Sequence, residues 1–162
     1  MTKMIPIVIT ILSCRGKYLF IQRRNPPYEG LWSMVGGKVN IGEHIHEAAI
    51  REVREETGTN EVVEYDYRGI VSERLIDTNK TLLSHFIIFV GHASINDFNE
   101  DHREGELALF ALDEIEAIKE QFLPSDYEMF YRFLSTSMES SVHEVELLRD
   151  DKGYHLVYYR VP

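Results

Sequence analysis

The sequence predicts a single domain of the α/β (α+β) class, in which helices pack against a mixed β-sheet. Three observations lead to this prediction. The chain has 162 residues, 44% of them hydrophobic, which is enough for one substantial core. Strand-like segments both precede and follow a central helix-like segment, an order that favours a mixed sheet over a regular βαβ winding. No repeat, low-complexity tract or linker divides residues 1–162.

The N-terminal third predicts a hairpin followed by a loop. Residues 5–14 and 18–24 are rich in apolar and β-branched side chains and are separated only by Arg15-Gly16-Lys17, so we expect two antiparallel strands. Two prolines and a glycine in residues 25–30 predict a loop. Residues 31–39 are short and extended and contain the pair Gly36-Gly37.

The central segments predict one helix and two long strands. Residues 44–57 contain no glycine or proline and are followed by Gly58, which is typical of a helix end. Residues 62–75 and 81–95 are β-like, and residues 96–105 form a polar, mostly acidic loop.

The C-terminal part predicts an extension made of a helix and a hairpin. We expect helices over residues 113–121 and 125–136, separated by Pro124, with a capping-box spacing from Ser125 to Glu128 at the start of the second. The alternating segments 142–148 and 154–161 predict a terminal hairpin. The aromatic side chains of this extension, about 125–162, suggest a homodimer.

The charge of the chain limits its partners. The sequence has 17 Lys and Arg residues against 27 Asp and Glu residues, a net charge of −10. An acidic surface repels phosphate backbones and anionic lipids, so we expect neither nucleic acid nor a membrane as a partner. A small phosphorylated substrate remains compatible with this charge if a cation bridges the two.

The apolar run at residues 4–14 has two interpretations. It ends in Ile-Leu-Ser-Cys, which loosely resembles a lipoprotein cleavage site, but its basic region is thin and its β-branched residues favour a strand. We predict a buried strand, with export as the alternative. Because Cys14 is the only cysteine, no internal disulfide can form and we expect a cytoplasmic protein. No apolar run reaches the ~20 residues of a membrane span.

The helix at 44–57 contains the residues that point to chemistry. Glu52, Glu55 and Glu56 lie at i, i+3 and i+4, so the three carboxylates project from one face and repel one another unless a cation lies among them. Clustered carboxylate oxygens suit Mg²⁺ or Mn²⁺. The alternative is a solvated helix face, because Arg51 pairs at i±4 with Glu47 and Glu55.

The surroundings of this helix resemble the Nudix box, G-x5-E-x7-R-E-U-x-E-E-x-G-U, in which U is a bulky aliphatic residue. The positions that match are Gly37, Glu43, Arg51, Glu52, Val53, Glu55, Glu56 and Gly58. Thr59 departs from the pattern at the last position, and the box occupies residues 37–59. The resemblance implies a Nudix-type α/β/α sandwich with a mixed sheet.

The resemblance also implies roles for individual residues. Glu52, Glu55 and Glu56 would bind the metal, Mg²⁺ with Mn²⁺ as a substitute, together with the Gly36 carbonyl. Glu55 would also be catalytic. Arg51 and Glu43 would assist by holding the carboxylates in place. A further acidic residue often comes from a later loop; among Glu100, Asp101, Glu104 and Glu106 the local pattern favours Glu104, with a solvated loop charge as the alternative.

Five residues near the box are candidates for substrate binding. Arg23, Arg24 and Lys38 are the basic groups nearest to it and could contact phosphate oxygens, although strand-end surface charges are an equal alternative. Tyr28 and Trp32 could stack on a base or sugar, with core packing as the alternative.

The resemblance implies a Mg²⁺-dependent hydrolase that cleaves the pyrophosphate bond of a nucleoside diphosphate joined to another group. We expect ordinary or oxidised nucleoside triphosphates as substrates, with ADP-ribose or another nucleotide sugar as the runner-up and dinucleoside polyphosphates still open. The alternative function is a Nudix domain that senses a nucleotide metabolite without turning it over.

Overall fold

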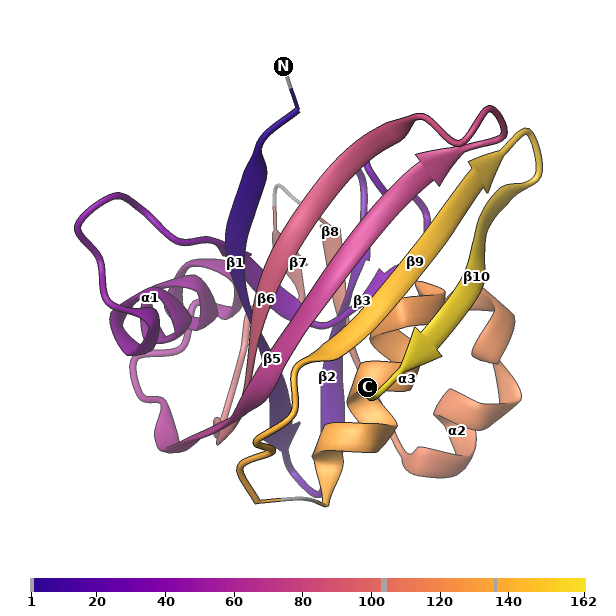
Figure 1. The fold of residues 1–162 in the computed structure, drawn as a ribbon. Helices are drawn as coiled ribbons and strands as arrows, with labels where there is room; N and C mark the ends of the chain where they lie inside the picture. Colours follow the sequence, from indigo (N-terminus) through magenta and orange to yellow (C-terminus); the bar gives the residue numbers. More distant parts are fainter. Residues whose placement is uncertain (1, 103–104, 136) are drawn as a thin grey trace.

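The computed structural model describes residues 2–102, 105–135 and 137–162 as a curved mixed sheet with helices on both sides (Figure 1). The α/β class and the mixed sheet predicted from the sequence are confirmed. The strands are β1 Met4–Cys14, β2 Lys17–Arg23, β3 Trp32–Ser33, β4 Val35–Lys38, β5 Val63–Asp77, β6 Leu82–Ser94, β7 Asp101–His102, β8 Gly105–Phe110, β9 His143–Asp150 and β10 Gly153–Arg160. The helices are α1 Ile45–Thr57, α2 Leu112–Ala117, the 3₁₀ turn η1 Lys119–Gln121 and α3 Pro124–Leu134.

The sheet has the strand order β10-β9-β5-β6-β1-β2-β8-β7, with β3 paired to β2 and β4 paired to β1. The β1–β6 and β5–β9 pairings are parallel, and the other described pairings are antiparallel. Strand β1 changes partner along its length, because Ile7–Thr10 pair with β4 whereas Leu12–Cys14 pair with β2. This split brings the Gly36-Gly37 pair of β4 beside the middle of the sheet.

The two faces of the sheet are covered by different helices. Val8 of β1 packs on one face with Ala48 and Ala49 of α1. The next residue, Ile9, points to the opposite face and belongs to the main core cluster, which includes Phe130 of α3. Alternation along one strand therefore divides the interior into two layers, as expected for an α/β/α sandwich.

The helix boundaries differ in part from the sequence-based expectation. The end of α1 is confirmed, since Gly58 adopts a left-handed φ of 73° and its N–H donates to the Arg54 carbonyl over 2.9 Å. The expected capping box at Ser125 is wrong. Pro124 already occupies the first turn of α3, a position where its missing N–H has no cost, and Ser125 is buried inside the helix.

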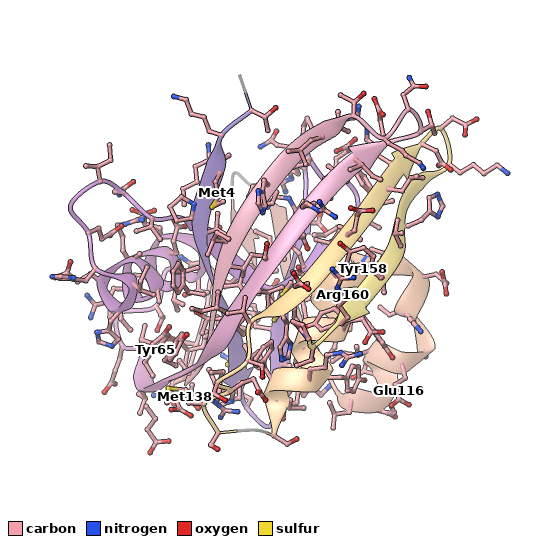
Figure 2. All side chains as sticks on the ribbon, in the orientation of Figure 1. Met4, Tyr65, Glu116, Met138, Tyr158 and Arg160 are labelled. Atoms are coloured by element: carbon pink, nitrogen blue, oxygen red, sulfur yellow. The ribbon has the colours of Figure 1, made fainter. Side chains whose placement is uncertain are left out.

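The predicted terminal hairpin is confirmed and lengthens the sheet. β9 pairs antiparallel with β10 and parallel with β5, so the last 20 residues continue the central layer (Figure 1). Figure 2 shows Tyr158 and Arg160 on the outer strand, where the Arg160 guanidinium lies 4.6 Å from the centre of the Tyr158 ring. Within the described parts of the chain, no helix has both the length and the apolar character needed to cross a membrane.

Candidate active site

Helix α1 carries the three predicted carboxylates at different depths. It is anchored by Ala48, Ala49 and Val53, which are fully buried. Glu56 is 4% exposed, the Glu52 side chain is 13% exposed and the Glu55 side chain is 55% exposed. The alternative of a fully solvated helix face is therefore incorrect for Glu52 and Glu56. A carboxylate is rarely buried without a compensating partner, so both side chains need one.

The two glycines of β4 let the strand approach these carboxylates closely. A Cβ atom on Gly37 would lie 2.5 Å from the carboxyl carbon of Glu52. A Cβ atom on Gly36 would collide with the carbonyl oxygen of Val8 in the neighbouring strand. The Gly36 N–H donates to Oε2 of Glu56 over 3.2 Å. Glycine is therefore required at position 36, where the backbone of β1 leaves no room for a Cβ, whereas a Cβ at position 37 would displace the Glu52 side chain.

Arg51 joins the carboxylates into one network. Its Nε donates to Oε1 of Glu43 over 2.6 Å, and one terminal nitrogen donates to Oε1 of Glu52 over 2.8 Å and to Oε2 of Glu55 over 3.2 Å. The other terminal nitrogen donates to Oε2 of Glu43 over 3.0 Å and to the carbonyl of Lys38 over 2.9 Å. The planar fork of an arginine allows all of these contacts at once.

The network changes the ionisation of its members. The hydrogen bond from Arg51, with a second one from the Asn40 N–H, lowers the pKa of Glu43 to about 2. The hydrogen bond to Glu43 in turn raises the pKa of Arg51 well above its usual value. Both groups are therefore charged throughout the physiological pH range.

A cavity of about 450 Å³ opens beside this network. Its walls combine residues of β4 and α1 with residues from the 25–30 loop, β5 and α3; among them are Gly37, Lys38, Glu52, Tyr28, Glu73 and Asp126. A larger cavity of about 700 Å³ lies between the C-terminal hairpin and α3 and includes none of the α1 carboxylates. The smaller cavity is therefore the one that adjoins the acidic cluster.

The family model of the NUDIX domain matches residues 2–133. The chain belongs to the Nudix family. The ADP-ribose pyrophosphatase of Methanocaldococcus jannaschii is 44% identical over 48 residues, which is 30% of this chain and 28% of the relative. The CTP pyrophosphohydrolase of Escherichia coli is 41% identical over 78 residues, 46% of this chain and 58% of the relative. The chain thus spans less than two thirds of either relative's length.

Solved structures share this fold over most of the chain. The MutT protein from Bacillus halodurans superposes with a TM-score of 0.74 at 23% identity, covering 97% of each chain. A bifunctional NMN adenylyltransferase/ADP ribose pyrophosphatase from Francisella tularensis, complexed with AMP and a Mn ion, has a TM-score of 0.64 at 20% identity over 83% of this chain and 42% of that chain. At these identities the likeness shows the fold alone.

The Nudix-box donors suit a hard divalent cation in their chemistry. Glu52, Glu55 and Glu56 supply carboxylate oxygens, and the adjoining strand supplies the Gly36 carbonyl oxygen. Oxygen atoms of these two kinds are the donors that Mg²⁺ and Mn²⁺ prefer. Among the described residues, no three acidic, histidine or cysteine side chains converge on one point. The Arg51 guanidinium instead contacts Glu52 and Glu55 and neutralises part of their charge.

The cavity contains a second pair of carboxyl groups that sequence reasoning missed. Glu73 of β5 is 2% exposed, accepts a hydrogen bond from the Tyr28 hydroxyl at Oε2 over 3.1 Å, and has no partner at Oε1 among the described residues. Asp126 of α3 is 6% exposed and accepts the Met34 N–H at Oδ2 over 2.8 Å. Burial, together with the charge of Glu73, raises the pKa of Asp126 to about 7.

A signal for one member of this pair was present in the sequence. Glu73 stands between Val71 and Leu75 at an inward position of an alternating strand, where an apolar residue is expected. Burial raises the pKa of Glu73, and the hydroxyls of Ser125 and Tyr28 oppose that shift. Asp126 carried no such signal, because an acidic residue in the first helical turn is ordinary.

Of the five residues predicted to bind substrate, three line the cavity and two do not. Arg23, Tyr28 and Lys38 line the cavity, and Nε of Arg23 donates to the Pro27 carbonyl over 3.0 Å. Arg24 is exposed and is not part of the lining. Trp32 is half-buried with its ring centre 5.0 Å from that of Phe110, and it also stands outside the lining. A substrate role for each of the five stays a prediction.

The predicted acidic loop is described only in part. Glu104 lies outside the described residues, so its role as a further acidic group stays a prediction. Strand β7 lies within the segment that was expected to be a loop, and Glu106, on β8, is exposed. The carbonyl of Glu100 accepts the Leu107 N–H over 3.0 Å, which ties the middle of the predicted loop to β8.

Proposed function

We propose that this chain is a metal-dependent Nudix hydrolase that cleaves the pyrophosphate bond of a nucleoside diphosphate joined to another group. The observation that carries the proposal is that Glu52, one of the box carboxylates, lines a cavity of about 450 Å³. A volume of this size can hold the nucleoside part of a small substrate.

The residues of the chain have distinct parts in this proposal. Glu52, Glu55, Glu56 and the Gly36 carbonyl would hold Mg²⁺ or, as a substitute, Mn²⁺. When bound, the ion offsets the charge of the diphosphate and lowers the pKa of a coordinated water. Arg51, held by Glu43, fixes the orientation of Glu52 and Glu55.

Positioning of the substrate falls to the cavity residues. Lys38 and Arg23 lie in the lining and would contact phosphate oxygens, which orients the phosphorus for attack. Tyr28 would contact the base or sugar. Glu55 or Glu104 would accept the proton of the attacking water, which then adds to phosphorus as the P–O–P bond breaks and two phosphate products leave.

The substrate that we propose is a nucleoside triphosphate, ordinary or oxidised, with ADP-ribose or another nucleotide sugar as the runner-up. Similar proteins carry different names in this respect, since one is an ADP-ribose pyrophosphatase, one a CTP pyrophosphohydrolase and one a putative 8-oxo-dGTP diphosphatase. We also propose a cytoplasmic location, which the free, buried thiol of Cys14 supports. A homodimer stays a prediction that light scattering tests.

The test is a hydrolysis screen with Mg²⁺, in which the cleavage products are separated and identified by ion-exchange chromatography. The panel contains nucleoside triphosphates with their 8-oxo forms, ADP-ribose, other nucleotide sugars and dinucleoside polyphosphates. The Glu56→Gln variant runs beside wild type, and Glu116→Gln, an exposed position on α2 (Figure 2), serves as the matched control.

The proposal expects selective turnover of one class, lost in Glu56→Gln and kept in Glu116→Gln. Turnover that survives Glu56→Gln would place the chemistry elsewhere. If no substrate is turned over but a nucleotide still raises the melting temperature, the proposed hydrolase function is wrong and the alternative, a metabolite sensor, takes its place.

A further inference from the structure

The C-terminal hairpin contacts the loop that forms one wall of the cavity. The Tyr28 N–H donates to the phenol oxygen of Tyr154 over 3.2 Å, and the Tyr154 hydroxyl donates to Oε2 of Glu29 over 3.3 Å. The two tyrosine rings meet edge to face with their centres 5.0 Å apart. One phenol of β10 thus acts as acceptor and donor for two successive loop residues.

The backbone at Tyr28 requires such support. Its φ is +71°, a left-handed conformation that is unfavourable for a residue with a large side chain. The base of the loop is closed from within, because the Gly30 N–H donates to the Arg23 carbonyl over 2.7 Å and the Arg23 N–H donates to the Leu31 carbonyl over 3.0 Å. The partner of the Tyr28 N–H itself comes from outside the loop, from Tyr154.

The conformation of Tyr28 determines a contact inside the cavity. The side chain is 6% exposed, and its hydroxyl donates to Oε2 of Glu73 over 3.1 Å. Burial and the neighbouring Glu73 raise the pKa of Tyr28 well above its usual value, so the phenol stays a donor. The other carboxyl oxygen of Glu73 is buried without a partner among the described residues, and Glu73 lines the cavity. The Tyr28 contact therefore fixes one oxygen of a buried carboxyl group that belongs to the cavity wall.

We propose that Tyr154 is a positioning residue of the substrate cavity, which acts through the Tyr28 backbone to set the hydrogen bond between Tyr28 and Glu73. The hairpin, which lies outside the Nudix box, thereby becomes part of the binding site. This inference rests on the proposed function only in taking the cavity as the place where substrate binds.

Other groups also act on the Glu73 carboxyl, and the test must separate them from Tyr28. Ser125 and Asp126 face it from α3, and Tyr159 of β10 is close enough to feel its charge. Arg23 acts on Asp126 from β2. Substitution of Tyr154 or Tyr28 by Phe changes none of these charges, so a change at Glu73 reports the tyrosine contacts.

The first experiment measures the titration of Glu73 by NMR, with carbon-13 in the side-chain carboxyl groups and the Glu73 signal assigned by its absence in Glu73→Gln. Tyr28→Phe removes a hydrogen bond that favours the carboxylate, so the titration midpoint of Glu73 should rise. Tyr154→Phe keeps the ring contact but loses both hydrogen bonds, and the midpoint should rise in the same direction by a smaller amount. An unchanged midpoint in Tyr154→Phe would overturn the proposal, even if that variant were less stable.

The matched control is Tyr158→Phe on the same strand. Its side chain is labelled in Figure 2, and its hydroxyl accepts a hydrogen bond from Arg74 over 2.8 Å. Tyr158 is not among the residues that line the cavity. The Glu73 midpoint should stay at the wild-type value in this variant. A rise equal to that of Tyr154→Phe would mean that loss of any hairpin hydroxyl has the same effect. That result would contradict a specific positioning role for Tyr154.

The second experiment compares steady-state kinetics of the same variants on the substrate found by the screen. Tyr154→Phe should raise KM several-fold with kcat nearly unchanged, because the box carboxylates are untouched, and Tyr158→Phe should change neither. A loss of kcat alone would contradict a role in positioning the binding site. If the screen finds no turnover, the proposed function fails, while the Glu73 titration still decides the role of Tyr154.

Discussion

The backbone N–H of Met34 donates a hydrogen bond to Oδ2 of Asp126 over 2.8 Å, although the two residues lie 92 positions apart. This bond ties the strand segment before the Nudix box to the first turn of α3. It also gives one buried carboxyl oxygen a fixed partner, while burial and the charge of Glu73 raise the pKa of Asp126 to about 7. The stability of the fold should therefore depend on the protonation of Asp126.

We predict that Asp126→Asn becomes more stable relative to wild type as the pH rises. The carboxyl titrates near 3.8 when unfolded and near 7 when folded, so between these values the folded state binds more protons and wild-type stability falls with pH. Asparagine keeps an acceptor for the Met34 N–H and does not titrate. Urea unfolding at pH 5 and pH 8 measures the difference in free energy of unfolding between the variant and wild type. Between these two pH values, that difference should change in favour of the variant by about 2 kcal/mol or more. The same difference at both pH values would show that Asp126 titrates normally.

Two variants of α1 test the carboxylates that we propose as metal ligands. Glu55→Gln and Glu56→Gln should each reduce kcat/KM by about 100-fold or more, because each removes a negative charge that would attract the cation. Both should stay folded, since Glu55 is largely exposed and a glutamine at 56 still accepts the Gly36 N–H. Circular dichroism melting checks the fold. Activity near the wild-type level in either variant would exclude that residue as a ligand.

Gly37→Ala should disturb the site while leaving the core intact. The new Cβ would lie 2.5 Å from the Glu52 carboxyl carbon, so that side chain must move. We expect a 10- to 100-fold loss of kcat/KM, on the order of what misplaced metal ligands cost. The control is Gly16→Ala, which has no atom within 4 Å but has a φ of +76°. It should cost about 1 kcal/mol of stability and no activity; equal activity losses in both variants would indicate a general folding defect.

Arg51→Lys should raise the Mg²⁺ concentration needed for half-maximal activity, by roughly 10-fold. Lysine keeps the charge but cannot contact Glu43, Glu52 and Glu55 at once, so the orientation of the carboxylates is lost. Titration of activity with Mg²⁺ measures the effect. A decrease in the required Mg²⁺ would mean that Arg51 acts mainly as a competitor of the cation.

Local patterns were sufficient for most of the fold and for the box. The 44–57 helix and its end at Gly58, the first hairpin and the terminal hairpin each depend on short-range periodicity or turn residues, and each is confirmed. The start of α3 was misread because two N-terminal signals, Pro124 and Ser125, stand next to each other. Proline at the first helical position took precedence and moved Ser125 into the buried part of the helix.

By itself, the sequence determined the mixed α/β class and the spacing of Glu52, Glu55 and Glu56, because helix and strand periods place such side chains through local geometry. Only the tertiary structure decided that Glu73 and Asp126 line one cavity and that Tyr154 contacts Tyr28 in its wall. These residues come from β5, α3 and β10, and their proximity follows from strand order and helix packing. No local pattern encodes a contact between residues 126 positions apart, such as that of Tyr28 with Tyr154.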